Sequence, residues 1–114
     1  MSERAFRIKV RGIFDRLSPE QRDELIGQAA EHDVLNAAFT TEGHLSYDLA
    51  ARPFFTFRFL ESGQSAEDIE PATARALAAA TTWLTDHGYG FRDLKTEAED
   101  MSQAALSKRQ RRAL

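Results

Sequence analysis

Phe-Phe-Thr-Phe-Arg-Phe-Leu, residues 54–60, is the stretch of sequence that decides the fold. Phe55, Phe57 and Phe59 recur with a period of two, and Thr56 and Arg58 stand between them. Only a β-strand sends alternate side chains to opposite faces, so this strand has one aromatic face and one polar face. An aromatic sheet face of this kind has to be covered by helices.

Two further strands are predicted by the same alternation, one near each end of the chain. The first covers residues 6–14, with Phe6, Ile8 and Val10 facing inward and Arg7, Lys9 and Arg11 facing outward. Gly12 interrupts this series and marks a bulge or a close approach of the backbone. The last strand covers residues 91–99, with Leu94, Thr96 and Ala98 inward and Lys95, Glu97 and Glu99 outward.

Two helices are predicted between these strands. Ser18 and Gln21 form a capping box around Pro19, so the first helix begins here and runs to about residue 32. Its apolar stripe is Leu25, Ile26, Ala29 and Ala30. The second helix runs from about residue 71 to about residue 87, and Gly88 is its natural stop. Its apolar positions are Ala72, Ala76, Leu77, Ala80, Trp83 and Leu84.

Residues 33–48 show no clean period, although their apolar members, such as Leu35, suggest burial. Thr41-Glu42-Gly43 is typical of a turn or a bulge. Residues 44–47 alternate again, with Leu45 and Tyr47 on one side. The segment predicts one interrupted strand, and a pair of short strands is the alternative.

The order of elements is therefore β-α-β-β-α-β, which predicts an α+β fold. The pattern is that of a ferredoxin-like sandwich, an antiparallel sheet with two helices on one face and the first and third strands at its centre. Residues 1–101 form this single domain. Residues 102–114 hold four cations and little apolar area, so we expect a basic and mobile tail.

The composition suits one soluble domain and excludes several kinds of chemistry. The 114 residues are 42% hydrophobic, which allows one core, and the net charge of −3 gives no general affinity for nucleic acid. The absence of cysteine excludes disulfides, thiolate catalysis and Cys-based zinc sites. There is no apolar run of membrane-spanning length, no signal-peptide pattern and no cofactor motif. We expect a cytoplasmic protein with no cofactor, no metal and no membrane partner.

The polar side of the predicted sheet is the first place where a site could lie. Candidate ligand-binding residues there are Arg7, Arg11 and Arg58, with His44 on the same face or at its rim. Adjacent strands also offer opposite charges. The alternative is therefore a solvated face with cross-strand ion pairs, each worth about 0.2–1 kcal/mol.

The aromatic residues offer a second place, a cavity between the sheet and the helices. Trp83 is the candidate ligand-binding residue there, and ordinary core packing of the aromatic rings is the alternative. His44 and Tyr47 are the candidate catalytic residues, because imidazole and phenol can transfer protons. They are three positions apart, so a regular strand places them on opposite faces. His32 and His87 lie near predicted helix C-termini, where a cation favours the helix dipole.

Four blocks of sequence resemble a family of short, uncharacterised actinobacterial proteins of the Streptomyces type, a domain of unknown function. They are residues 2–14, residues 31–40, Thr-Phe-Arg-Phe at 56–59, and Phe-Arg-Asp-Leu with Asp-Met within residues 91–101. The resemblance spans almost the whole chain and implies a cytoplasmic protein, but it transfers no activity and no site residues. The element order is also similar to that of the dimeric α+β barrel proteins, which include small monooxygenases, cyclases and stress proteins.

Two functions from different classes are compatible with these features. The first is a homodimeric small-molecule-binding or interaction module, favoured by the open sheet face and the lack of a catalytic motif. The alternative is a cofactor-free cyclase, isomerase or oxygenase of secondary metabolism that works in the aromatic-lined cavity. The sequence leaves it open whether the protein is an enzyme. Nucleic-acid binding is disfavoured, because no exposed aromatic residue is expected on the central strands.

Overall fold

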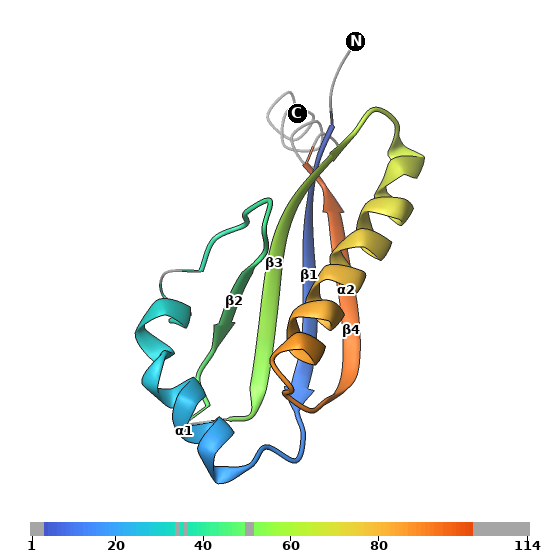
Figure 1. The fold of residues 1–114 in the computed structure, drawn as a ribbon. Helices are drawn as coiled ribbons and strands as arrows, with labels where there is room; N and C mark the ends of the chain where they lie inside the picture. Colours follow the sequence, from blue (N-terminus) through green and yellow to red (C-terminus); the bar gives the residue numbers. More distant parts are fainter. Residues whose placement is uncertain (1–3, 34, 36, 50–51, 102–114) are drawn as a thin grey trace.

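The computed structural model describes residues 4–33, 35, 37–49 and 52–101 of the chain (Figure 1). The predicted tail at 102–114 lies outside the described residues. The described residues form four strands, two α-helices and two short 3-10 helices, η1 and η3. In chain order they are β1 (Arg4–Phe14), α1 (Pro19–Gly27), η1 (Ala29–His32), β2 (His44–Tyr47), β3 (Phe54–Gly63), η3 (Ala66–Asp68), α2 (Ile69–Asp86) and β4 (Phe91–Asp100).

The four strands form one antiparallel sheet in the order β2-β3-β1-β4. The first and third strands are therefore central, as the sequence predicts. Lys9 lies opposite Arg58 in the register of β1 and β3, and His44 lies opposite Arg58 in that of β2 and β3. The prediction of an α+β domain with an antiparallel sheet and two α-helices is confirmed.

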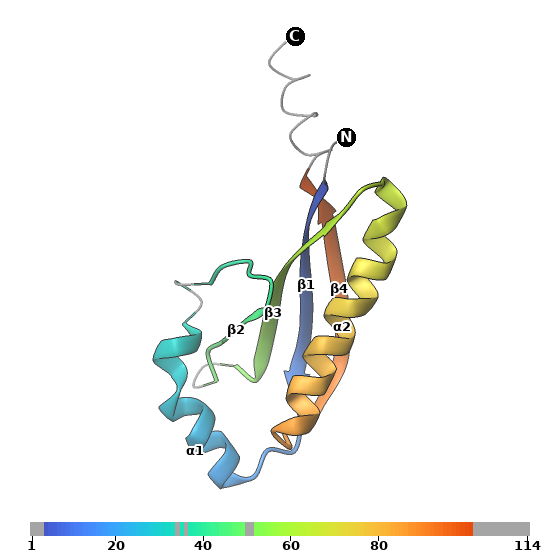
Figure 2. The same ribbon diagram turned by 45° about the horizontal axis from the view of Figure 1, so that its top comes forward.

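The aromatic face of β3 forms the centre of the core, as predicted. Phe55, Phe57 and Phe59 are buried, and consecutive rings lie 5.7 and 6.2 Å apart between centroids. Helix α2 lies along β1 and β4 in both views (Figures 1 and 2) and also contacts β3. It turns a row of small residues toward the sheet, which lets the helix approach the large rings closely. The small residues of the row are Ala72, Ala76 and Ala80, and the larger Leu84 follows them on the same face; all four are buried.

The first helix is shorter than predicted. Its capping box is confirmed, because the backbone N–H of Gln21 donates to Ser18 Oγ and that of Ser18 donates to Gln21 Oε1. The helix ends at Gly27, however, and the expected stripe is wrong: Leu25 is buried, whereas Ile26 is 41% exposed. Both Ala29 and Ala30 are exposed as well. The physical reason is position, because α1 lies at the end of the sheet near β2 (Figure 2) and only one of its side chains reaches the core.

The irregular segment before β2 makes one bridge rather than a long strand. Thr40 pairs with Phe59 in a parallel bridge, a turn follows at Gly43, and β2 then runs antiparallel to β3. Gly43 has φ +87°, and a Cβ there would lie 2.3 Å from the ring of Phe59, so glycine is required on both grounds. Leu35 is 91% exposed, which contradicts the expectation that it is buried.

The edge strand β4 is only partly packed. Thr96 and Ala98 lie opposite the buried Val10 and Ile8 and therefore share the inward face, as predicted, but both are exposed. Leu94 is half-buried against the core. The predicted irregularity at Gly12 is confirmed, because the register between β1 and β4 shifts between Arg11 and Ile13.

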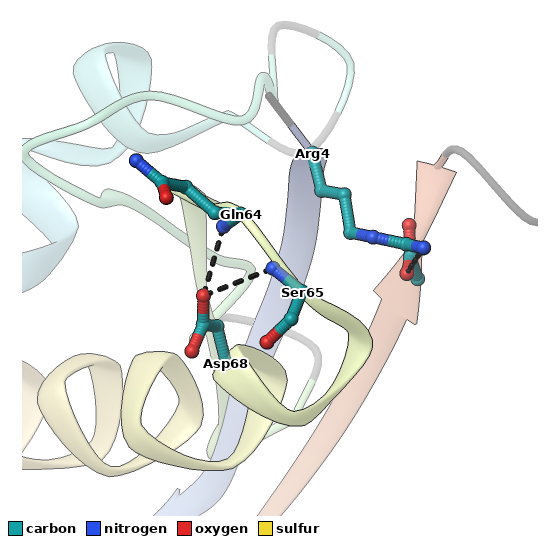
Figure 3. Close-up of polar contacts among 5 residues, drawn as sticks. Arg4, Gln64, Ser65 and Asp68 are labelled. Carbon is teal, nitrogen blue, oxygen red and sulfur yellow. Dashed lines mark hydrogen bonds and ion pairs between the residues drawn. The ribbon is translucent and has the colours of Figure 1, made fainter. Parts of the chain in front are cut away.

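Hydrogen bonds hold the junction between β3 and α2, and Ile69 at the start of α2 packs against the core. In Figure 3 the carboxylate of Asp68 points toward the backbone, and it accepts from the N–H groups of Gln64 at 2.8 Å and Ser65 at 3.1 Å. These two bonds lower the pKa of Asp68. At the same end of the sheet, Arg4 donates to Asp100 at 2.8 Å and ties β1 to β4.

Candidate functional site on the open sheet face

The sheet has a second face, turned away from α2, which we call the open face. Alternation along the strands puts the neighbours of the buried residues there, and no described helix packs against it. The open face carries Arg7, Lys9, Arg11 and Ile13 on β1, Phe54, Thr56, Arg58 and Leu60 on β3, His44 and Ser46 on β2, and Lys95, Glu97 and Glu99 on β4. The predicted assignment of the charged residues to this face is confirmed.

Two hollows of about 330 Å³ each lie side by side on the open face, at the end of the sheet where β3 begins. The β2-side hollow is lined by Ser46, Tyr47, Asp48, Arg52, Phe54, Thr56 and Arg58. The β1-side hollow is lined by Arg11, Gly12, Ile13, Phe54, Phe55, Thr56, Asp93 and Lys95. Phe54 and Thr56 contribute to both, so β3 forms a ridge between them. Each volume is of the size that a small organic ligand needs.

Arg58 is a half-buried cation of the open face, and it lies opposite Lys9 in the register of β1 and β3. Its Nη1 donates to Ser46 Oγ at 2.6 Å. No described carboxylate lies within ion-pair distance of its guanidinium. Burial lowers the pKa of Arg58, and the neighbouring cation of Arg11 lowers it further. The fold therefore holds a positive charge here without neutralising it.

The other two candidate arginines are engaged elsewhere on the open face. Arg11 donates to Glu97 at 2.7 Å, so the predicted cross-strand pairing of charges is confirmed for this pair. The guanidinium of Arg7 lies 5.2 Å above the ring centre of Phe39, a cation–π contact. A third and smaller hollow of about 170 Å³ lies beside Arg7, and Glu97 and Glu99 contribute to its lining.

The two candidate catalytic residues lie on opposite faces of β2, as their spacing predicts. The Tyr47 hydroxyl donates to the carbonyl of Leu25 on the covered side, and burial, with a contribution from nearby ionisable groups, raises its pKa to about 12. His44 faces the open side, where its buried Nδ1 has no hydrogen-bond partner among the described residues. The pair therefore lacks the geometry for shared proton transfer.

Trp83 and the three candidate arginines lie on opposite sides of the sheet, because Trp83 belongs to α2 on the covered side. Its ring stacks on His87 at 4.0 Å and contacts Phe57 at 5.7 Å between centroids. His87 Nδ1 donates to the carbonyl of Trp83 at the end of α2, which confirms the predicted capping role. His32 lies in the last turn of η1, near a helix C-terminus as predicted, and its Nδ1 donates to the Leu45 carbonyl of β2 at 2.9 Å rather than to a carbonyl of its own helix.

The described residues contain no group of three or more histidine, aspartate or glutamate side chains placed to hold a metal ion. Within the same part of the chain, no helix combines the length and the hydropathy needed to cross a membrane.

The chain was compared with known protein families. A family of unknown function, DUF6204, matches residues 1–112. The chain belongs to this family. The resemblance to an uncharacterised domain family is thus confirmed, and the match covers every described strand and helix of this chain. No curated protein and no solved structure matches the chain significantly.

Two residues of the β2-side hollow in this DUF6204 chain were not predicted from the sequence. Phe54 is 49% exposed and stands between the two hollows. The position of Phe54 could have been predicted from the alternation of side chains along a strand, because Phe54 directly precedes Phe55 and must face the opposite side. It also corrects the expectation that no central strand exposes an aromatic ring. Arg52 precedes β3 and has no periodic pattern that would place it in the hollow.

Proposed function

We propose that this protein is a homodimeric module that binds a small molecule on its open sheet face. The observation that carries the proposal is the pair of adjoining hollows of about 330 Å³, which meet at Phe54 beside a half-buried Arg58 that has no described carboxylate partner. A hollow with an apolar wall and a few polar groups that converge is the usual form of a ligand site.

The fold supports this proposal, because we assign it to the ferredoxin-like class. The connection from β1 through α1 to β2 skips β3, and the connection from β3 through α2 to β4 skips β1. Two such split βαβ units leave one sheet face under the helices and the other uncovered. A face of this kind is available for a ligand or for a second copy of the chain.

The dimer part of the proposal rests on what the open face exposes. The β2 edge already has a contact within the chain, because His32 bonds to the Leu45 carbonyl on the outer strand. Phe54, by contrast, is 49% exposed, and the half-buried Ile13 lies opposite it on β1. A second copy seated on this face would cover both side chains and close the hollows between two sheets.

Light scattering across protein concentration tests the dimer. We expect the mass of a dimer at high micromolar concentration. Phe54→Asp should give a monomer, whereas Ile26→Asp, on α1 and exposed to a similar degree, should leave the dimer intact. A wild-type monomer at high micromolar concentration would remove the dimer from the proposal.

Chemical-shift mapping with a small set of organic fragments tests the binding. Fragments that bind should shift the backbone amide signals of Ser46, Thr56 and Arg58 more than those of α2. A fragment set that shifts no open-face signal, or shifts mainly α2, would contradict a ligand site in the hollows.

A further inference from the structure

We propose that the ligand of the β2-side hollow is a small organic anion with a flat apolar part. Its anionic group binds between Arg58 and Arg52, and its apolar part lies against Phe54. This inference rests on the proposed binding function and names the chemical class of the ligand.

The charge of Arg58 is the first argument. A guanidinium has five N–H donors, and the one hydrogen bond found here, to Ser46 Oγ, uses one of them. Arg4, Arg11, Arg75 and Arg92 each have a carboxylate partner within 3.7 Å, and Arg58 has none among the described residues. A cation that is half-buried and unpaired is stabilised by any anion that can reach its free donors.

The support of Arg58 is the second argument. Ser46 is only 2% exposed although it lies on the open face, and its hydroxyl is within 3.5 Å of the Thr56 carbonyl. The same hydroxyl accepts from Arg58 at 2.6 Å. Ser46 is therefore a positioning residue: it holds the guanidinium at the wall of the hollow and reduces the side-chain entropy lost on binding.

The charges around the β2-side hollow are the third argument. Arg52 contributes a second cation to the lining, and Arg11 adds positive potential from the neighbouring strand. Asp48 is the one carboxylate of the lining, and it lies beyond ion-pair distance of both arginines. Two cations against one acid disfavour a cationic ligand.

The exposed ring of Phe54 indicates that the rest of the ligand is apolar and flat. It is half-exposed on the ridge between the hollows, next to the arginines that line one of them. An inorganic anion would make no apolar contact with the part of this ring that lines the β2-side hollow, whereas an aromatic or other flat apolar group would cover it. A carboxylate attached to an aromatic ring satisfies both the charge and the apolar wall.

Titrations of the full-length chain with three probes test the inference, with backbone amide shifts as the readout. The probes are 2-naphthoate, its uncharged analogue 2-naphthamide, and inorganic phosphate. We expect 2-naphthoate to bind at the β2-side hollow at least about tenfold tighter than either of the others, because charge-assisted hydrogen bonds to arginine are the stronger kind.

Arg58→Gln should remove that preference for the carboxylate, and Arg52→Gln, at an exposed position, should reduce it. Arg75→Gln on α2 is the matched control and should change nothing, because Arg75 pairs with Glu61 on the covered side. The amide spectrum of each variant shows whether it is folded. Ser46→Ala should weaken 2-naphthoate binding while Ser46→Thr, which keeps the hydroxyl, should restore most of it.

The possible failures are distinct. Equal binding of 2-naphthoate and 2-naphthamide in the hollow would overturn the anion and leave the binding function in place. Phosphate that binds as tightly as 2-naphthoate would overturn the role of Phe54. Binding of 2-naphthoate that is unchanged in a folded Arg58→Gln would move the site away from Arg58 and overturn the inference. The absence of shifts with all three probes overturns it too, and the fragment mapping then decides whether the binding function falls with it.

Discussion

The two faces of β3 differ in what their side chains do, although they come from alternate residues of one segment. On the covered face Phe55, Phe57 and Phe59 are buried and contact one another or the helix. On the open face Thr56 and Arg58 line hollows, and a cation stays without a described carboxylate partner. The comparison teaches that one strand can supply the stability of the fold on one side and a place for a ligand on the other.

The largest expected effect belongs to the covered face. Phe57→Ala removes a ring that contacts Phe55, Phe59 and Trp83, so it should lower the free energy of unfolding by about 3–5 kcal/mol. Urea melts measure this loss. Thr56→Ala is the control on the other face of the same strand and should cost less than about 0.5 kcal/mol. Comparable losses for the two variants would break the distinction between the faces.

A second substitution tests the close packing of Gly43 against the ring of Phe59 on the covered face, near β2. Gly43→Ala puts a methyl group into the ring of the buried Phe59 and forces an L-residue into φ +87°, so it should cost at least about 1–3 kcal/mol. Gly27→Ala is the control, because a Cβ there meets nothing within 4 Å; it should be neutral or add up to about 1 kcal/mol. Urea melts that show the same stability for both variants would contradict the packing of Gly43 on Phe59.

The third prediction concerns the polar contact inside the covered face. Tyr47→Phe leaves the Leu25 carbonyl without its hydroxyl donor and should cost about 1–2 kcal/mol at neutral pH. The pH dependence follows from the raised pKa of Tyr47, about 12 against an ordinary value of 10.0.

The folded state holds the phenolic proton more tightly than the unfolded chain does. Stability from Tyr47 is therefore complete below pH 10 and is lost as the pH rises from 10 to 12. Burial, followed by a hydrogen bond with Glu24, gives Tyr89 the same raised pKa, so Tyr47→Phe should reduce this alkaline loss without abolishing it. Chemical melts at pH 9, 10 and 11 measure the slope. If the slope is the same in Tyr47→Phe, groups other than Tyr47 cause the loss of stability at alkaline pH.

The smallest effects are expected on the open face. Arg11→Gln breaks the exposed pair with Glu97 and should cost about 0.2–1 kcal/mol. Arg58→Gln removes a half-buried charge with no described acid partner, so the free energy of unfolding should change by less than about 0.5 kcal/mol or rise slightly. Salt titration sharpens the test, because the stability that Arg11→Gln loses should shrink as the salt concentration rises. A large loss for Arg58→Gln would mean that Arg58 supports the fold rather than a ligand.

The long strands could be predicted because a period of two over many residues has one structural meaning. The central position of β1 and β3 was predicted from the order of strands and helices along the chain, not from this period. The alternation of β1 and β3 was enough to assign the phenylalanines to the core and the arginines to the open face. The prediction for the first helix was wrong because its sequence pattern was too weak. Its few apolar residues matched a helical stripe by chance, and its position at the end of the sheet left Ile26 and Ala29 without a surface to pack on.

The sequence by itself determined which residues of the regular strands share a face, since in an uninterrupted strand the face follows from parity along the chain. Tertiary structure alone decided which charges are neutralised. Arg11 and Arg58 both alternate with apolar residues, yet Arg11 meets Glu97 on β4 and Arg58 meets Ser46 on β2. The reason is physical: partners across strands are set by register and by the order β2-β3-β1-β4, which here bring together residues 86 positions apart in one pair and 12 in the other.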